Sequence, residues 1–197
     1  MFLQCVQFHP NSNYIATGSS DRTVRLWDNV TGTQVRLMTG HKGQIYSLAF
    51  SVEGRFLASA GSDFKIMLWD LAHGHLLASL SGHSSTIYAL CFSRDGNLLT
   101  SGTIETFSNS PCFYRHGIII FFFLFTLGSL DCTVKIWDFT KLGEEISLED
   151  VNVSHNPDIK NNSENYLLRS YATKSSPILS LHFTRRNLML AVGIFDS

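Results

Sequence analysis

A ten-residue string occurs three times in this chain, and its spacing constrains the fold more than any other feature. The copies are SSDRTVRLWD ending at Asp28, GSDFKIMLWD ending at Asp70 and SLDCTVKIWD ending at Asp138. Trp27 and Trp69 lie 42 positions apart, and His41 and His83, each preceded by a glycine, have the same spacing. A fixed period of this length predicts a series of similar supersecondary units rather than one irregular domain.

Alternating apolar residues and turn residues divide the best-preserved unit into four strands. We expect these strands over 45–50, 55–60, 65–70 and 75–80. Short strands joined by turns that contain glycine form an antiparallel sheet. We expect LLRSY (167–171) to be the fourth strand of the third unit, and the stretches 177–183 and 187–193 to start a fourth unit.

The period, the Gly-His pairs and the Trp-Asp endings resemble the WD-repeat (WD40) family. That family folds as a β-propeller in which each blade is a four-stranded antiparallel sheet. The resemblance implies an all-β, partial propeller of about three and a half blades. The first Gly-His pair would precede Met1, so we expect the chain to begin inside a blade. Because propellers close with about four to eight blades, we do not expect this stretch to close a ring alone.

The same resemblance implies structural tetrads of hydrogen-bonded side chains. These are His41, Ser59, Asp63 and Trp69 in the second unit, His83, Ser101, Asp131 and Trp137 in the third, and Thr17, Asp21 and Trp27 in the first. A group of Ser, His and Asp also suggests a hydrolase triad. However, the hydroxyl oxygen accepts a hydrogen bond from the indole N–H in such a tetrad. Neither a nucleophile elbow nor an oxyanion loop accompanies the group. We therefore expect a structural role and no enzyme activity.

The third unit is longer than the others by 26 residues, because Asp63 and Asp131 lie 68 positions apart. Continuing from Gly102 directly to Ser129 restores both the spacing and the motif, which predicts an insertion over 103–128. The edges are ambiguous, since a glycine stands at each border. This segment shares no pattern with the rest of the chain.

Three origins or roles are considered for the insertion. Its FFFLF string (121–125) can be encoded wholly by pyrimidines, like the end of an intron, so our hypothesis is a retained intron read in frame. The alternative is a genuine loop that carries a hydrophobic plug for a partner. The apolar run over 118–125 is shorter than the roughly 20 residues that span a bilayer, which disfavours a membrane anchor.

The repeat pattern also predicts the organisation of the whole chain. Residues 1–102 hold the first two units and the start of the third, 129–138 continue the third unit to its third strand, and 166–197 hold its last strand and a terminal half-unit. Between them, 139–165 carries two lysines against six acidic residues. A segment of that charge with few large apolar residues is expected to be disordered.

Composition excludes several function classes. A net charge of −1 offers no electrostatic footprint for nucleic acid or an anionic membrane. The N-terminus lacks the features of a secretory signal, and the four cysteines show no paired spacing, which favours a reducing compartment. We expect no cofactor, no metal and no small-molecule substrate.

Three longer strings narrow the resemblance. FHPNSNYIATGSSDRTVRLWD, TGHKGQIYSLAF and LHFTRRNLMLAVG are similar to the TBP-associated WD-repeat subunits of the general transcription factor TFIID and to their sister subunits in histone acetyltransferase coactivator complexes. The resemblance covers residues 2–102 and 129–193. It implies a nuclear scaffold whose partners are protein subunits, including histone-fold TBP-associated factors.

Other functions stay open at this stage. The alternatives are a generic WD-repeat adaptor of another complex and a truncated or aberrantly spliced product without stable function. For a scaffold, the loops supply four exposed candidates for partner binding, namely Arg22, Lys42, Phe64 and Ser85.

Overall fold

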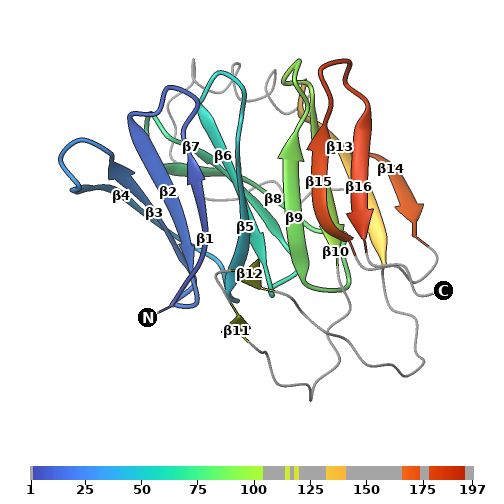
Figure 1. The fold of residues 1–197 in the computed structure, drawn as a ribbon, viewed down its shortest axis with the longest axis horizontal. Helices are drawn as coiled ribbons and strands as arrows, with labels where there is room; N and C mark the ends of the chain where they lie inside the picture. The colour runs from blue at the N-terminus through green and yellow to red at the C-terminus, as the bar shows by residue number, and fades with distance from the viewer. Residues whose placement is uncertain are drawn as a thin grey trace.

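The computed structural model describes residues 2–103, 114–115, 118–119, 132–140, 166–173 and 178–193. Their strands form three four-stranded sheets and two two-stranded sheets, and all of the strand pairs are antiparallel. Figure 1 shows the larger sheets side by side, with the turns between the first and second strands at the same end, at the top of the view. Within these ranges, no helix is long and apolar enough to cross a membrane.

In the first two sheets, the spatial order of the strands follows the chain. The first sheet contains β1 (Leu3–Phe8), β2 (Tyr14–Ser19), β3 (Thr23–Asp28) and β4 (Gln34–Thr39), and the second contains β5 (Ile45–Phe50), β6 (Phe56–Gly61), β7 (Ile66–Asp70) and β8 (His75–Leu80). Each strand of the second sheet lies within one residue of its predicted range. The prediction of a four-stranded antiparallel unit is therefore confirmed.

The third sheet is assembled from strands that are far apart in the sequence. It contains β9 (Ile87–Phe92), β10 (Leu98–Thr103), β13 (Thr133–Asp138) and β14 (Leu167–Ala172). β10 pairs directly with β13, in a register that sets Leu98 opposite Asp138 and Gly102 opposite Val134. The sheet therefore has the same strand order as the first two, although its second and third strands are separated by a long stretch of chain.

Part of the predicted insertion is described. Thr103 ends β10, and β11 (Tyr114–Arg115) pairs with β12 (Ile118–Ile119) in a short antiparallel ladder. The other residues of 103–128 lie outside the described residues, as do 141–165 of the predicted acidic segment. The origin of the insertion and the disorder of the acidic segment stay predictions.

The last two strands form a hairpin that packs beside the third sheet. They are β15 (Ile178–Phe183) and β16 (Met189–Gly193), and both lie within the predicted ranges. Ile178 and Leu181 on β15 share a buried cluster with Ala89 and Val134 of the third sheet. The hairpin therefore occupies the place of a following blade.

The second sheet is the most buried because it lies between two others. One apolar cluster joins it to the first sheet, and another joins it to the third. All residues of β6 and β7 are buried. A strand covered on both faces needs apolar residues on both, which explains why FLASAG and IMLWD show almost no polar alternation.

Specific contacts also join the neighbouring sheets. His9, which follows β1, donates from Nε2 to the carbonyl oxygen of Gly54 at 2.8 Å, and its ring meets Phe50 edge-on with centroids 5.1 Å apart. Tyr46 on β5 stacks on Tyr88 on β9 with centroids 4.8 Å apart. The first three sheets are thus connected by polar as well as apolar contacts.

Candidate interaction surface and the hydrogen bonds beneath it

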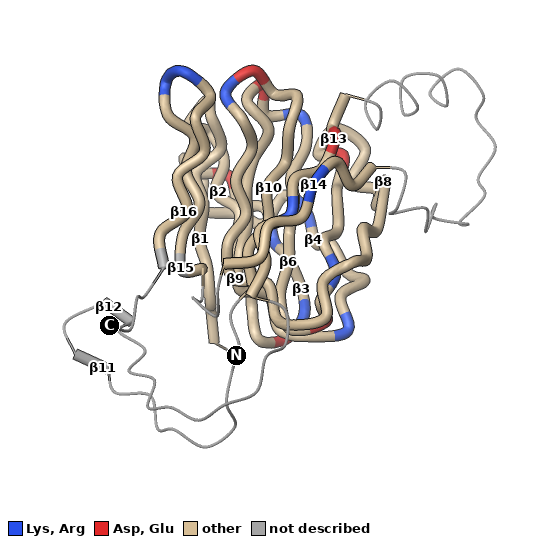
Figure 2. The backbone as a smooth tube through the Cα atoms, turned by 90° about the vertical axis from the view of Figure 1, so that its right-hand side faces the viewer, with Lys and Arg blue, Asp and Glu red and all other residues tan. Residues whose placement is uncertain are grey.

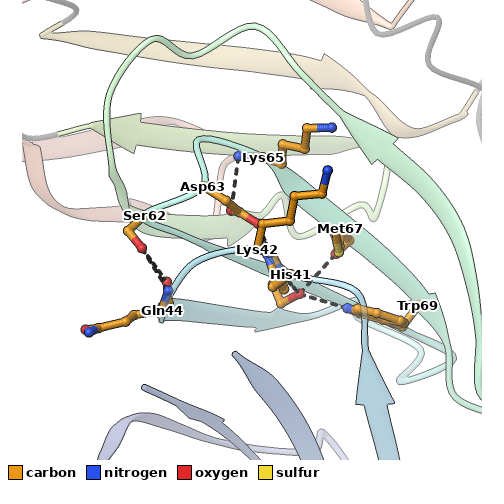
Figure 3. A network of polar contacts seen from close by, with 9 residues as sticks. His41, Lys42, Gln44, Ser62, Asp63, Lys65, Met67 and Trp69 are labelled. Atoms are coloured by element: carbon orange, nitrogen blue, oxygen red, sulfur yellow. Dashed lines mark hydrogen bonds and ion pairs between the residues drawn. The ribbon is translucent and has the colours of Figure 1, made fainter. Parts of the chain in front are cut away.

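A chain of four side chains connects the loop before β5 to strands β6 and β7 (Figure 3). The indole of Trp69 donates from Nε1 to Ser59 Oγ at 2.8 Å, and this hydroxyl donates to His41 Nε2 at 2.7 Å. His41 Nδ1 then donates to Asp63 Oδ2 at 2.7 Å. Each ring nitrogen and the hydroxyl has a partner, so the polar groups are buried without the penalty of an unmade hydrogen bond.

Asp63 organises the turn between β6 and β7. Besides the imidazole, it accepts hydrogen bonds from the backbone N–H groups of Lys42 at 3.0 Å and Lys65 at 3.4 Å. Burial by itself would raise the pKa of this carboxyl, but the hydrogen bonds from the imidazole of His41 and from the backbone N–H groups of Lys42 and Lys65 hold the pKa below its ordinary value of 3.8. Asp63 is therefore ionised at neutral pH and connects two loops.

The glycine before each tetrad histidine is favoured by its backbone conformation, and at Gly82 also by close packing. Gly40 and Gly82 both have φ near +155°, a backbone conformation that residues other than glycine rarely adopt. A Cβ atom on Gly40 would lie 3.4 Å from the ring of Trp69, and one on Gly82 would lie 3.1 Å from the ring of Trp137. The Gly-His pair thus brings the backbone against the tryptophan and aims the imidazole at the serine.

The third sheet repeats most of this arrangement. His83 Nε2 lies 2.6 Å from Ser101 Oγ, and Trp137 Nε1 donates to the same oxygen at 2.9 Å. His83 Nδ1 also lies 3.4 Å from the hydroxyl of Thr133. Asp131, the remaining predicted member, lies outside the described residues.

The first sheet shows the pattern without the histidine. Trp27 Nε1 donates to Thr17 Oγ1 at 2.9 Å. Asp21 accepts hydrogen bonds from Thr23 and pairs with Arg25 at 2.8 Å. The hydroxyl of Thr23, followed by weaker contributions that include Arg25, lowers the pKa of Asp21 to about 2. Asp21 thus stabilises its own turn through the contacts that the structure describes.

The Ser-His-Asp geometry of the second sheet does not form a hydrolase site. Ser59 has no solvent exposure and His41 is only 6% exposed. The hydroxyl of Ser59 is already hydrogen-bonded to the indole of Trp69 and the imidazole of His41. A substrate carbonyl could not approach the oxygen without unpacking the sheet, so the triad-like arrangement holds the fold together.

The loops around these tetrads form one surface, which we call the tetrad rim. It comprises the β2–β3 and β6–β7 turns and the β4–β5 and β8–β9 loops, which lie at the same end of their sheets because the strands alternate in direction. Arg22 and Phe64 occupy equivalent positions in the two turns, with φ values of +70° and +64°. Both are exposed, and Phe64 retains 41% of its accessible surface.

The other two predicted partner-binding residues lie in the loops of the tetrad rim. Lys42 is exposed, whereas its backbone N–H is held by Asp63. Ser85 was expected to be exposed but is half-buried, because its loop descends directly into buried Thr86 and Ile87. The predicted residues therefore supply two exposed cations and one exposed aromatic ring, and Ser85 is less accessible than predicted.

Two grooves lie away from the tetrad rim. One of about 460 Å³ opens between the first two sheets and is lined by His9, Arg36 and Arg55 among others. The other, of about 310 Å³, follows the first strands and is lined by Tyr88, His182 and neighbouring residues. Both present mixed polar and aromatic walls. In the described ranges, no group of three His, Cys, Asp or Glu side chains is placed to bind a metal.

The cysteines of the described residues show no sign of a reactive thiol. Cys5, Cys91 and Cys132 are not joined in disulfides in the part of the chain that the structure describes. Burial raises the pKa of Cys5 to about 12, in spite of a hydrogen bond with the backbone of Gly18. A thiol with such a pKa is almost wholly protonated at neutral pH and is a poor nucleophile.

Comparison with protein families identifies the repeated unit. The model described as "WD domain, G-beta repeat" matches residues 3–28, 32–70 and 74–138. These matches cover the first two sheets and extend through β13 of the third.

Several known proteins are similar to the chain. Transcription initiation factor TFIID subunit 5 from Caenorhabditis elegans is 33% identical over 191 residues, which are 97% of this chain and 26% of that protein. TFIID subunit 5 from Drosophila melanogaster is 48% identical over 59 residues, which are 30% of this chain and 8% of that protein. Nuclear distribution protein PAC1 from Mycosarcoma maydis is 43% identical over 42 residues, 21% of this chain and 9% of that protein. The chain thus spans about a quarter of the C. elegans protein.

Proposed function

Because the chain belongs to the WD-repeat family, we propose that it is a non-catalytic scaffold that binds other proteins through the tetrad rim. Arg22, Lys42 and Phe64 supply the exposed contacts. Arginine and aromatic side chains contribute most to protein interfaces. The tetrads hold the loops in place, so little conformational entropy is lost on binding.

We further propose that the assembly is of the TFIID type. The observation that carries this proposal is the similarity to C. elegans TFIID subunit 5, which extends over 97% of the chain. The expected partners are histone-fold TBP-associated factors, and the expected location is the nucleus. PAC1, coronin-7 and pre-mRNA-processing factor 19 match 21 to 27% of the chain, which supports the broader WD class without favouring one of their complexes.

A pull-down from nuclear extract tests both levels of the proposal. The tagged chain and a form without residues 103–128 are compared at equal expression, and histone-fold TBP-associated factors should be recovered. Recovery of coactivator subunits without TBP would favour the sister complex. Recovery of unrelated WD-protein partners would leave the generic adaptor as the function. An insoluble parent chain would favour a product without stable function.

A variant set then tests the surface itself. The triple variant Arg22→Ala, Lys42→Ala, Phe64→Ala should lose the partners, because it removes the two fully exposed cations and the exposed ring of the rim. The double variant Val30→Ala, Val52→Ala changes two exposed residues in the β3–β4 and β5–β6 turns at the other end of the sheets and serves as the control. Equal recovery by the triple variant and the parent chain would refute the proposed surface.

A further inference from the structure

Three arginines gather at the end of the molecule opposite the tetrad rim. Arg94 lies in the β9–β10 turn, and Arg185 and Arg186 lie in the β15–β16 turn. All three are exposed. Figure 2 shows the basic tip of the β15–β16 hairpin next to the β9–β10 tip, which carries charges of both signs. We call these three residues the arginine cluster.

The two turns are tied together and are internally rigid. The backbone N–H of Arg94 donates to the side-chain oxygen of Asn187 at 3.1 Å. Thr184 Oγ1 accepts from the N–H groups of Arg186 and Leu188, and its carbonyl accepts from the N–H of Asn187 at 3.1 Å. The backbones that carry the arginines are therefore held in a fixed relation before any ligand binds.

The guanidinium groups are not neutralised within the part of the chain that the structure describes. None of the three makes a hydrogen bond or an ion pair there. The neighbouring carboxylate, Asp95, instead accepts hydrogen bonds from Ser93 and from the N–H of Asn97 in its own turn. The cluster thus presents several unused charged donors on a stable support.

The chemistry of the cluster favours carboxylates of a protein. Guanidinium forks bind planar carboxylates in a bidentate manner, and they do so best where the fork is already positioned. A nucleic acid would meet Asp95 beside Arg94, and the chain as a whole carries a net charge of −1. A peptide can match this pattern by setting acidic residues opposite the arginines and a donor opposite Asp95.

We propose that the arginine cluster is a docking surface for an acidic segment of a protein partner. It joins the turns of two successive sheets, so an occupant would also clamp the β15–β16 hairpin to the third sheet. This surface goes beyond the proposed scaffold function and is spatially separate from the tetrad rim. A scaffold with both surfaces could hold two partners at opposite ends of the same sheets.

Fluorescence anisotropy with labelled poly-glutamate tests the proposal on the full chain. The triple variant Arg94→Gln, Arg185→Gln, Arg186→Gln should bind about tenfold more weakly, since exposed ion pairs are individually weak but three are removed. Raising the salt concentration should weaken the binding of poly-glutamate by the parent chain and reduce the difference in affinity between the parent and the triple variant. Arg169→Gln, at an exposed arginine of β14 outside both proposed surfaces, is the matched control and should bind like the parent.

A charge-reversed form guards against a loss that reflects misfolding. The double variant Arg185→Glu, Arg186→Glu should no longer bind poly-glutamate and should bind poly-lysine. Its circular dichroism spectrum should match that of the parent. Equal poly-glutamate binding by the parent and the triple variant would overturn the proposal, and so would tighter binding of poly-uridine RNA than of poly-glutamate by the parent. Because the readout is poly-glutamate binding and not partner capture from nuclear extract, this result is distinguishable from failure of the tetrad rim.

Discussion

His41 Nδ1 lies 2.7 Å from Asp63 Oδ2, and this pair joins the loop before β5 to the turn between β6 and β7. The side chains are 1% and 7% exposed. Because the same carboxylate holds the backbone N–H of Lys42, the contact sets the position of an exposed residue of the tetrad rim. A folding contact is thereby coupled to a proposed binding surface.

Asp63→Ala should destabilise the fold rather than abolish a catalytic activity. It leaves the imidazole of His41 and the N–H of Lys42 without their acceptor, which costs about 1 to 3 kcal/mol for buried groups. Urea unfolding measures the effect. Asp21→Ala is the control, because Asp21 stands at the equivalent position without a histidine partner and should have a smaller effect. A variant with full stability that has lost a hydrolytic activity would contradict this assignment.

Stability should fall on acidification, in part through Asp63. Its pKa is lower in the folded chain than its ordinary value of 3.8, so the unfolded chain binds more protons in this range. The contribution of ionised Asp63 to the free energy of unfolding is complete above pH 3.8. It is lost as the pH falls through the pKa that Asp63 has in the folded chain. The urea midpoint of unfolding should therefore fall less with decreasing pH in the variant Asp63→Asn than in the parent chain. Parallel curves would show that another carboxylate is responsible.

Gly82→Ala should destabilise the third sheet. The φ of Gly82 is unfavourable for alanine, and the added Cβ would press against the ring of Trp137 at 3.1 Å. We expect a loss of more than about 1 kcal/mol. Gly40→Ala separates the two causes, because Gly40 has the same φ of +155° but a Cβ there would lie at an ordinary contact distance of 3.4 Å from its nearest neighbours. Equal losses in the two variants would mean that contact with the indole contributes little.

Phe64→Asn should stabilise the chain slightly while weakening partner capture. Asparagine tolerates the left-handed conformation better than a bulky aromatic residue does, so replacing Phe64 relieves strain. Thermal unfolding and the nuclear pull-down measure the two effects. A gain in stability with undiminished recovery would remove Phe64 from the proposed surface, and a loss of stability would show that its partly exposed ring packs usefully on the turn.

Deleting residues 103–128 should raise the soluble yield. Ser129 would then follow Gly102, so a short turn could join β10 to β13, which already pair from Leu98 to Gly102. Soluble and total protein are compared after equal expression. A less soluble deletion form would show that the segment is integral to the protein. The gene sequence across residues 102–129, read for splice borders, decides separately whether the segment is a retained intron.

The sequence by itself determined the repeating unit and much of its interior. A period of 42 residues predicted similar sheets, and alternation placed the strands of the second sheet within one residue of the structure. These features are local, because strand periodicity and turn chemistry act over a few residues. The four residues that the WD-repeat resemblance names in the second unit lie within hydrogen-bonding distance of one another.

Only the tertiary structure decided what lies between the sheets and on their ends. The bond from His9 to Gly54 and the stacking of Tyr46 on Tyr88 join residues about 40 positions apart that no local pattern pairs. Ser85 was expected to be exposed, but its burial depends on how its loop enters β9. Arg94 meets the β15–β16 turn across 93 positions, because β9 and β15 pack side by side. Packing between distant segments therefore placed the arginine cluster, whereas Arg22, Lys42 and Phe64 of the tetrad rim were predicted from the loops of the repeat.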